Sequence, residues 1–229
     1  QSKDVIRLDE GSWKKMPYRL EISRKNLINA QGAWTIVDRD EDGRSELLNY
    51  PMPSYTDYHP PKNVHCLEFF DFGFHSLGRL NLLGNVYING VLVADAKPQS
   101  GKELIISAGK KNRIWLFLFD PEDSLACKLP LYTHTAEDTS WKGKIVPVGL
   151  YDVNGDGRRD LISFMITTFW LYPRGVLVTD LEDGSTIWRF DTGCFIGSDY
   201  YIVDFDGDGR KELIFSGDAP ANGACANGT

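Results

Sequence analysis

The sequence is poor in the residues and motifs that usually mark enzymes. Only four histidines occur in 229 residues, and their spacing matches no metal-ligand pattern; they are His59, His65, His75 and His134. A Gly-x-Ser-x-Gly elbow, a His-Glu-x-x-His pair and a phosphate-binding glycine loop are all missing. We therefore expect a binding protein rather than a hydrolase, a metalloprotease or a nucleotide-dependent enzyme.

Cysteines and long apolar runs are also scarce. The four cysteines have no Cys-x-x-Cys spacing, which argues against a zinc site; they are Cys66, Cys127, Cys194 and Cys225. Their even number permits disulfides in an oxidising compartment, and buried free thiols fit equally well. The longest apolar stretches, 114–119 and 161–171, fall short of the roughly 18 uninterrupted residues of a spanning helix. The chain begins at Gln1 without a signal-peptide pattern, so we interpret it as a mature or trimmed chain.

Three acidic loops of nine residues organise the sequence, at 38–46, 152–160 and 204–212. Carboxylates this close together repel one another unless a cation neutralises them, and Ca²⁺ is the hard cation that gathers many oxygen ligands. Glycine at position six permits a sharp turn, and position seven would contribute a backbone carbonyl. The sequence therefore predicts three Ca²⁺ sites. The predicted ligand residues are Asp38, Asp40, Asp42, Arg44, Glu46, Asp152, Asn154, Asp156, Arg158, Asp160, Asp204, Asp206, Asp208, Arg210 and Glu212.

An EF-hand and an acidic turn without metal are the two other interpretations of these loops. An EF-hand needs a bidentate glutamate at position twelve, where this chain has Asn49, Ser163 and Phe215. An acidic turn without metal remains open, because Asp-Gly is common turn chemistry. The predicted ligand positions also explain the net charge of −7, since 11 of the 32 acidic residues occupy them and the other 21 are outnumbered by 25 Lys and Arg. No basic run suggests binding to nucleic acid.

The acidic loops belong to an internal repeat of about 55 residues. Their first positions, together with a related segment at Asp95, are spaced by 57, 57 and 52 residues: Asp38, Asp95, Asp152 and Asp204. In the second copy Lys97, Pro98 and Gln99 occupy the positions of the ligands. We expect this copy to keep its strands and to lack the metal.

Each repeat contains four short strand patterns, which predicts an all-β fold and a β-propeller of about four visible repeats. The inner strands are expected at 34–37, 91–94, 146–151 and 200–203, and a hairpin at 176–193. Residues 5–12 resemble the tail of a preceding unit, and the fourth unit stops after its second strand. We interpret residues 1–229 as one propeller domain or as part of a longer propeller. The first and last fragments could also join into one blade and close the ring.

The loops resemble the FG-GAP/VCBS repeat family, whose calcium-binding blades also occur in integrin α-chain propellers. The match is Asp-x-Asp/Asn-x-Asp-Gly-x-x-Asp/Glu followed by Leu-Leu or Leu-Ile, present three times. The resemblance implies an extracellular or periplasmic module, in some members attached to a sensor kinase, an adhesin or a carbohydrate-active enzyme. Fold alone does not fix function. A lyase-like enzyme domain or a receptor-kinase sensor domain is therefore kept as the alternative to a binding module.

A ligand surface is expected on the face opposite the acidic loops. The connecting segments there are rich in aromatic residues and proline, and such rings suit stacking on sugars or contact with a protein partner. The predicted ligand-binding residues are Tyr55, Tyr58, His59, Trp141, Trp170 and Arg174. The competing interpretation is that these side chains pack between blades.

Overall fold

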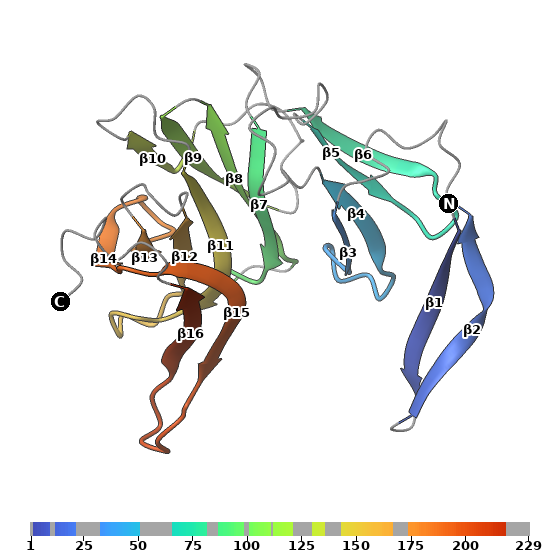
Figure 1. Ribbon diagram of the computed structural model, residues 1–229. Coiled ribbons are helices and arrows are strands. Elements are labelled where there is room, and N and C mark those ends of the chain that lie inside the picture. Colours follow the sequence, from blue (N-terminus) through green and yellow to red (C-terminus); the bar gives the residue numbers. More distant parts are fainter. Residues whose placement is uncertain are drawn as a thin grey trace.

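The computed structural model of the chain describes residues 2–9, 12–21, 33–50, 66–81, 87–98, 101–110, 112–120, 130–135, 143–166 and 174–218. Within these ranges the chain forms sixteen β-strands and no helix (Figure 1). The all-β class predicted from the sequence is confirmed. No helix in the described ranges has the length and apolar character needed to cross a membrane.

Three sheets have four strands each, and in each sheet consecutive strands are antiparallel neighbours. The first sheet contains Ala33–Val37 (β3), Glu46–Tyr50 (β4), Cys66–Phe70 (β5) and Ser76–Asn81 (β6). The second contains Tyr87–Ala94 (β7), Glu103–Lys110 (β8), Arg113–Phe119 (β9) and Tyr132–Thr135 (β10). The third contains Lys144–Tyr151 (β11), Asp160–Ile166 (β12), Gly175–Thr179 (β13) and Thr186–Asp191 (β14).

The two ends of the chain form smaller sheets. Ser2–Asp9 (β1) pairs with Ser12–Glu21 (β2), and Phe195–Val203 (β15) pairs with Glu212–Asp218 (β16). The predicted inner strands are confirmed within β3, β7, β11 and β15, and the predicted hairpin is confirmed as β13–β14. The two end fragments remain separate sheets, and the described strands do not form a closed ring. The structure therefore supports the repeat organisation without showing a complete propeller.

The central strands of the second and third sheets are buried on both faces because each of these sheets has other strands packed on either side. Every residue of β12 is buried, and so is every residue of β8 except its last. Their sequences are continuous runs of Leu, Ile, Phe and Met with a few small residues, which is the composition that such two-sided burial favours.

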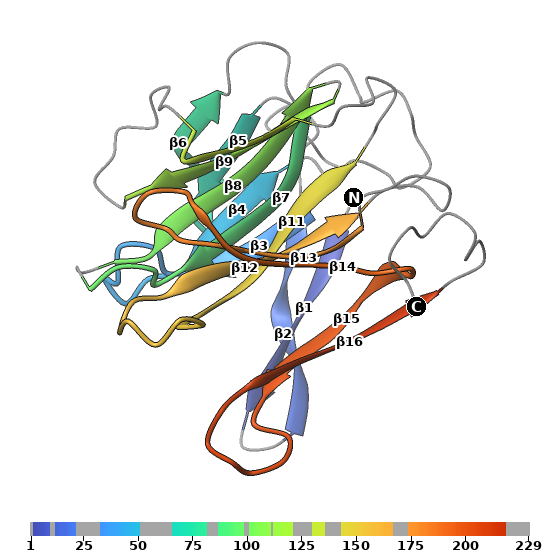
Figure 2. The same cartoon turned by 90° about the vertical axis from the view of Figure 1, so that its left-hand side faces the viewer.

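Successive sheets pack face to face through three apolar clusters. Leu48 and Leu67 of the first sheet pack with Ile106 of the second. A further cluster joins the second and third sheets, and another joins the third sheet to Ile202 and Leu213 of the β15–β16 hairpin. Figure 2 shows the β3–β4, β7–β8 and β11–β12 loops at one common edge of the sheets. The repeat therefore places these three loops side by side.

Candidate metal centres

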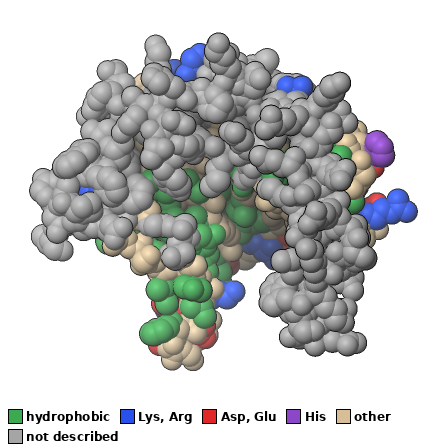
Figure 3. Space-filling view, turned by 45° about the vertical axis from the view of Figure 1, so that its right-hand side comes forward, with side chains coloured by type: hydrophobic (Ala, Val, Ile, Leu, Met, Phe, Trp, Pro, Cys, Tyr) green, Lys and Arg blue, Asp and Glu red, His purple; other side chains and the backbone are tan. Residues whose placement is uncertain are grey.

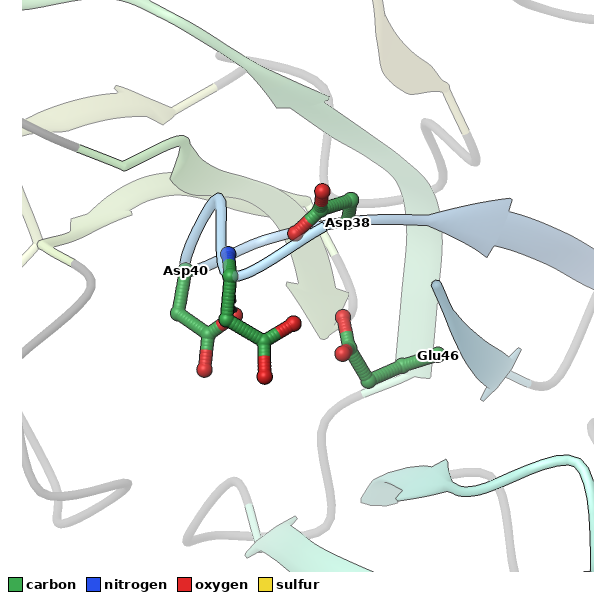
Figure 4. Close-up of side chains that lie close together, drawn as sticks. Asp38, Asp40 and Glu46 are labelled. Atoms are coloured by element: carbon green, nitrogen blue, oxygen red, sulfur yellow. Dashed lines mark hydrogen bonds between the residues drawn. The ribbon is translucent and has the colours of Figure 1, made fainter. Parts of the chain in front are cut away.

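The first acidic loop connects β3 to β4 and brings four carboxylates together. Asp38, Asp40, Asp42 and Glu46 each present an oxygen, and these four atoms lie within 4.8 Å of one another. Figure 4 shows Asp38, Asp40 and Glu46 turned toward one shared space. An all-oxygen set of anionic ligands suits a hard cation such as Ca²⁺.

The loop backbone is arranged by the same aspartates. Asp38 Oδ2 accepts the Gly43 N–H at 3.2 Å, and Asp42 Oδ1 accepts the Arg44 N–H at 2.7 Å. Gly43 has a φ of 85°, a conformation that residues with a Cβ rarely adopt. These hydrogen bonds fix the turn on which the acidic side chains converge.

The loop between β15 and β16 repeats this geometry. Asp204, Asp206 and Asp208 form a second group whose carboxylate oxygens lie within 4.8 Å of one another. Asp204 Oδ2 accepts the Gly209 N–H at 3.0 Å, and Gly209 has a φ of 88°. This group has three converging acids instead of four, since Glu212 is not one of its members.

The loop between β11 and β12 differs because an arginine contacts one of its predicted ligands. Arg158 Nη2 lies 3.0 Å from Asp156 Oδ2, and its guanidinium also contacts Glu182 in the β13–β14 turn. The same oxygen of Asp156 accepts the side-chain N–H of Asn154 at 3.1 Å. The Arg158 hydrogen bonds lower the pKa of the Asp156 carboxyl. A cation at this loop would have to displace the Arg158 side chain.

The segment between β7 and β8 lacks the acids at positions three and five and has a lysine instead. Lys97 stands at position three, where the other loops have Asp40, Asn154 or Asp206. Its ammonium lies 2.6 Å from Asp120 Oδ1, at the end of β9. A lysine at a ligand position places a positive charge where the other loops offer an oxygen to a metal.

The acid at position nine has the same role in all four segments, and the sequence did not reveal this role. In each case one of its oxygens accepts the backbone N–H of position two. The bonds are Arg39 N–H to Glu46 (3.0 Å), Ala96 N–H to Glu103 (2.6 Å), Val153 N–H to Asp160 (2.9 Å) and Phe205 N–H to Glu212 (2.7 Å). Glu103 was the signal in the sequence that could have revealed this role, because the second segment keeps this acid after losing those at positions three and five.

Burial raises the pKa of two of these position-nine acids. Desolvation raises the pKa of Glu46, and the neighbouring carboxylates of Asp40, Asp38 and Asp42 raise it further against the effect of the Arg39 N–H. Desolvation is also the largest cause of the raised pKa of Asp160. Asp160 is buried at the base of its loop, whereas Glu46 is half-buried.

Neighbouring loops are joined by cations at position eight. Lys102 Nζ donates to the Asp38 carbonyl at 3.0 Å, which ties the second segment to the first acidic loop. Arg159 contacts both the carbonyl and the carboxylate of Asp95, which ties the third loop to the second segment. A cavity of about 430 Å³ lies between these last two segments. Its guanidinium groups are already paired with acids, so it gives no separate ligand site.

The predicted ligand surface falls mostly on residues that the structure does not describe. Tyr55, Tyr58, His59, Trp141 and Trp170 lie outside the described ranges. Arg174 is described, and it is 1% exposed with Nη2 donating to the Gly193 carbonyl at 2.9 Å. The structure thus places Arg174 in the interior, where its guanidinium holds the chain before β15, and not on an accessible loop.

One of the four cysteines has a described side chain. Cys194 is a free thiol, and its Sγ lies 3.2 Å from Thr192 Oγ1. The side chains of Cys66, Cys127 and Cys225 lie outside the described part, so the disulfide alternative for those residues stays a prediction.

No protein family model matches this chain, and no curated protein matches it.

Proposed function

We propose that this chain is a calcium-binding β-propeller module that recognises a ligand outside the cytoplasm. The observation that carries the metal part is the convergence of carboxylate oxygens in the first and last acidic loops. The two loops lie at equivalent places in repeated strand pairs, and their Asp and Gly residues repeat the same hydrogen bonds. Repetition in register distinguishes them from an isolated acidic turn.

The donor atoms favour Ca²⁺ over other common metals. All the converging ligands are carboxylate oxygens, and no histidine or cysteine belongs to either described group. Zinc and copper sites normally include nitrogen or sulfur, whereas Ca²⁺ accepts flexible oxygen shells. Mg²⁺ requires a stricter octahedral shell and retains more of its water, so we expect it to bind more weakly.

The recognition part of the proposal concerns a glycan or a protein as the partner. The repeat resemblance and the suitability of such loops for extracellular calcium levels support it. Aromatic side chains on the loops opposite the calcium edge are the proposed contacts. Loops on a rigid scaffold are where binding residues usually concentrate.

Calorimetric titration of the chelator-treated protein with Ca²⁺ tests the metal part. Two strong sites should appear, at the loops beginning with Asp38 and Asp204. The loop beginning with Asp152 should bind more weakly, because the ion must displace Arg158. A matched titration with Mg²⁺ should give a smaller response. An absence of Ca²⁺ binding at millimolar concentration would show that the loops are ordinary acidic turns.

The partner is tested separately, with a glycan array and a peptide library probed in the presence of Ca²⁺. Binding that is lost in Tyr58→Ala or Trp170→Ala, while calcium binding is retained, would support the recognition surface. Binding that is unchanged by both substitutions would move the surface elsewhere.

A further inference from the structure

The third acidic loop differs from the other two in having an amide where they have an acid. Position three is Asn154 in this loop, whereas it is Asp40 in the first loop and Asp206 in the last. Asn154 is followed by Gly155, and Asn-Gly is the dipeptide in which asparagine loses its amide most readily, because glycine has no Cβ to hinder ring closure on its own nitrogen. The loop therefore has, at a predicted ligand position, a residue that can become an acid.

The surroundings of Asn154 leave it open to this reaction. The chain has four Asn-Gly pairs, and the structure describes two of them. Asn89 is 8% exposed within β7, and a Cβ on Gly90 would lie 3.0 Å from Pro147 Cδ. Asn154 and Gly155 are both exposed, and no described atom outside the adjacent residues lies within 4 Å of the place of a Cβ on Gly155. The loop gives its Asn-Gly pair the space and the water that β7 denies to the other pair.

The exposure of Asn154 is a property of the loop and does not depend on where the described chain ends. Asp40 has the same place beside the second sheet, which has all four of its strands, and it is exposed as well. Asp206 is also exposed, and Figure 3 shows acidic side chains at the tip of the projecting β15–β16 hairpin. Position three therefore faces solvent in all three acidic loops.

The hydrogen bonds of the third loop place a partner on each group that takes part in ring closure. The nucleophile is Gly155 N, whose N–H donates to Asp152 Oδ1 at 2.7 Å. A carboxylate at this place can accept the proton that the nitrogen loses as it attacks. The electrophile is Cγ of Asn154. Its oxygen, Oδ1, accepts the Asp156 N–H at 3.0 Å, a donor shared with Asp152 Oδ1 at 3.1 Å. This N–H can stabilise the negative charge that forms on Oδ1 during the attack.

We propose that Asn154 loses its side-chain amide in the folded protein and becomes an acid. Gly155 N attacks Asn154 Cγ and gives up its proton, the Cγ–Nδ2 bond breaks, and the nitrogen leaves as ammonia, so that a cyclic imide forms. Water then opens the ring. Cleavage between Gly155 N and Cγ gives aspartate, and cleavage between Gly155 N and the backbone carbonyl carbon of Asn154 gives isoaspartate. Water is the only co-reactant.

The modification changes the charge at the centre of the loop. Asn154 Nδ2 donates to Asp156 Oδ2 at 3.1 Å, and this hydrogen bond is lost with the amide. Two carboxylates then face each other, an arrangement that a cation between them makes favourable. The aspartate product gives the third loop the same acid at position three as the first and last loops have. This consequence rests on the proposed calcium function, whereas the modification itself does not.

The isoaspartate product alters the loop in another way, because it adds a carbon to the backbone and shortens the side chain. The turn that Gly155 and Gly157 form with φ values of 78° and 87° is then lengthened, and the carboxylate no longer stands where Asp40 and Asp206 hold theirs. We therefore expect the aspartate form to bind calcium more tightly than the isoaspartate form.

Incubation of the native chain in neutral buffer with chelator, followed by peptide mapping with mass spectrometry, tests the modification. Replacement of NH₂ by OH should accumulate at Asn154 and stay near background at the buried Asn89. The same chain unfolded in guanidinium chloride is the reference, because all its Asn-Gly pairs are accessible. Asn154 should react about tenfold faster in the folded protein, where the base and the N–H donor are held in place. An equal or slower reaction in the folded protein overturns the proposal.

Asp152→Asn separates the base from the turn. The new amide keeps an acceptor for the Gly155 N–H but takes up no proton, so the reaction at Asn154 should slow to the rate of the unfolded chain. Asp71→Asn is the matched control, because Asp71 Oδ1 also accepts a backbone N–H, from His75 at 2.8 Å, in the distant β5–β6 turn. Continued protection of Asn89 shows that each variant is folded. An undiminished rate in Asp152→Asn overturns the role of Asp152 as the base.

Asn154→Asp tests the consequence for calcium by building the product directly. In calorimetry its third loop should bind Ca²⁺ about tenfold more tightly than that of the unsubstituted chain, because affinity rises with the number of charged ligands. Asn154→Gln is the control, since it keeps a neutral amide and should show no gain. Unchanged affinity in Asn154→Asp would overturn the consequence for calcium and leave the mass-spectrometric result standing, so the two failures can be told apart.

Discussion

The acidic loop at 38–46 and the segment at 95–103 occupy the same place in two adjacent sheets, and they differ in what holds them. Both connect the first strand of a sheet to the second, and both have a position-nine glutamate that accepts the N–H of position two. The first adds converging carboxylates, whereas the second replaces them with Lys97 and its ion pair to Asp120. The comparison separates two features. The hydrogen bond from the N–H of position two to the position-nine acid, which we call the brace, is common to all four repeats. The metal site is present in only some of them.

Glu103→Ala should break the shared brace and have the largest effect on stability. Glu103 is fully buried and accepts the N–H groups of Ala96 and Lys97 at 2.6 and 3.3 Å. Its removal leaves these donors without their acceptor, which costs about 3 kcal/mol of unfolding free energy. Urea denaturation should show the same loss with Ca²⁺ and with chelator.

Glu103→Gln is the matched variant for that experiment. The amide keeps an acceptor oxygen at the same place, so most of the stability should return. A loss as large as that of Glu103→Ala would mean that the charge, and not the hydrogen bonds, holds the segment.

Asp206→Ala should sharpen the difference between the two kinds of loop. Removing one of the three converging acids of the last loop should abolish its calcium site. The loss of a ligand that binds only the folded state costs about 2–3 kcal/mol at a hundredfold excess over Kd, and nothing in chelator. Thermal unfolding with and without Ca²⁺ measures this difference.

Lys97→Ala, at the same position of the second segment, is its control. Its effect should be small and independent of Ca²⁺, because an ion pair that remains partly exposed contributes little. A calcium-dependent effect of Lys97→Ala would contradict the assignment of this segment as metal-free.

Arg158→Ala should have the smallest effect and should bring the third loop closer to the first. The variant removes the guanidinium from Asp156 and keeps the backbone carbonyl of position seven. Calcium affinity at this loop should rise by roughly threefold, the scale of one exposed ion pair. Calorimetry would show the weakest of the sites becoming stronger, and a fall in affinity would show that Arg158 assists the ion.

Much of the fold followed from the sequence because the repeat carries two signals at once. Apolar strands and Asp-Gly loops recur at nearly constant spacing, so the inner strands and the β13–β14 hairpin could be located before the structure was known. Closure into a propeller could not be settled in this way, because it depends on contacts between the first and last strands. The repeat pattern is the same for an open and a closed arrangement.

The sequence predicted which residue types form the metal sites, but it predicted less well which other residues contact them. The converging acids were found from spacing, since Gly43 and Gly209 fix the turns that bring them together. The Arg158 contact was missed because position seven was assigned a backbone role, and nothing in the sequence placed Glu182 next to it. The burial of Arg174 was missed because it depends on the chain folding back through Gly193.

The most direct test of the account is amide hydrogen exchange across the four loop segments, measured with saturating Ca²⁺ and with excess chelator. The account predicts that Ca²⁺ slows exchange at 38–46 and 204–212, slows it less at 152–160, and leaves 95–103 unchanged. Equal protection of all four segments, or no protection of any, would contradict the claim that calcium binds only where the carboxylates converge.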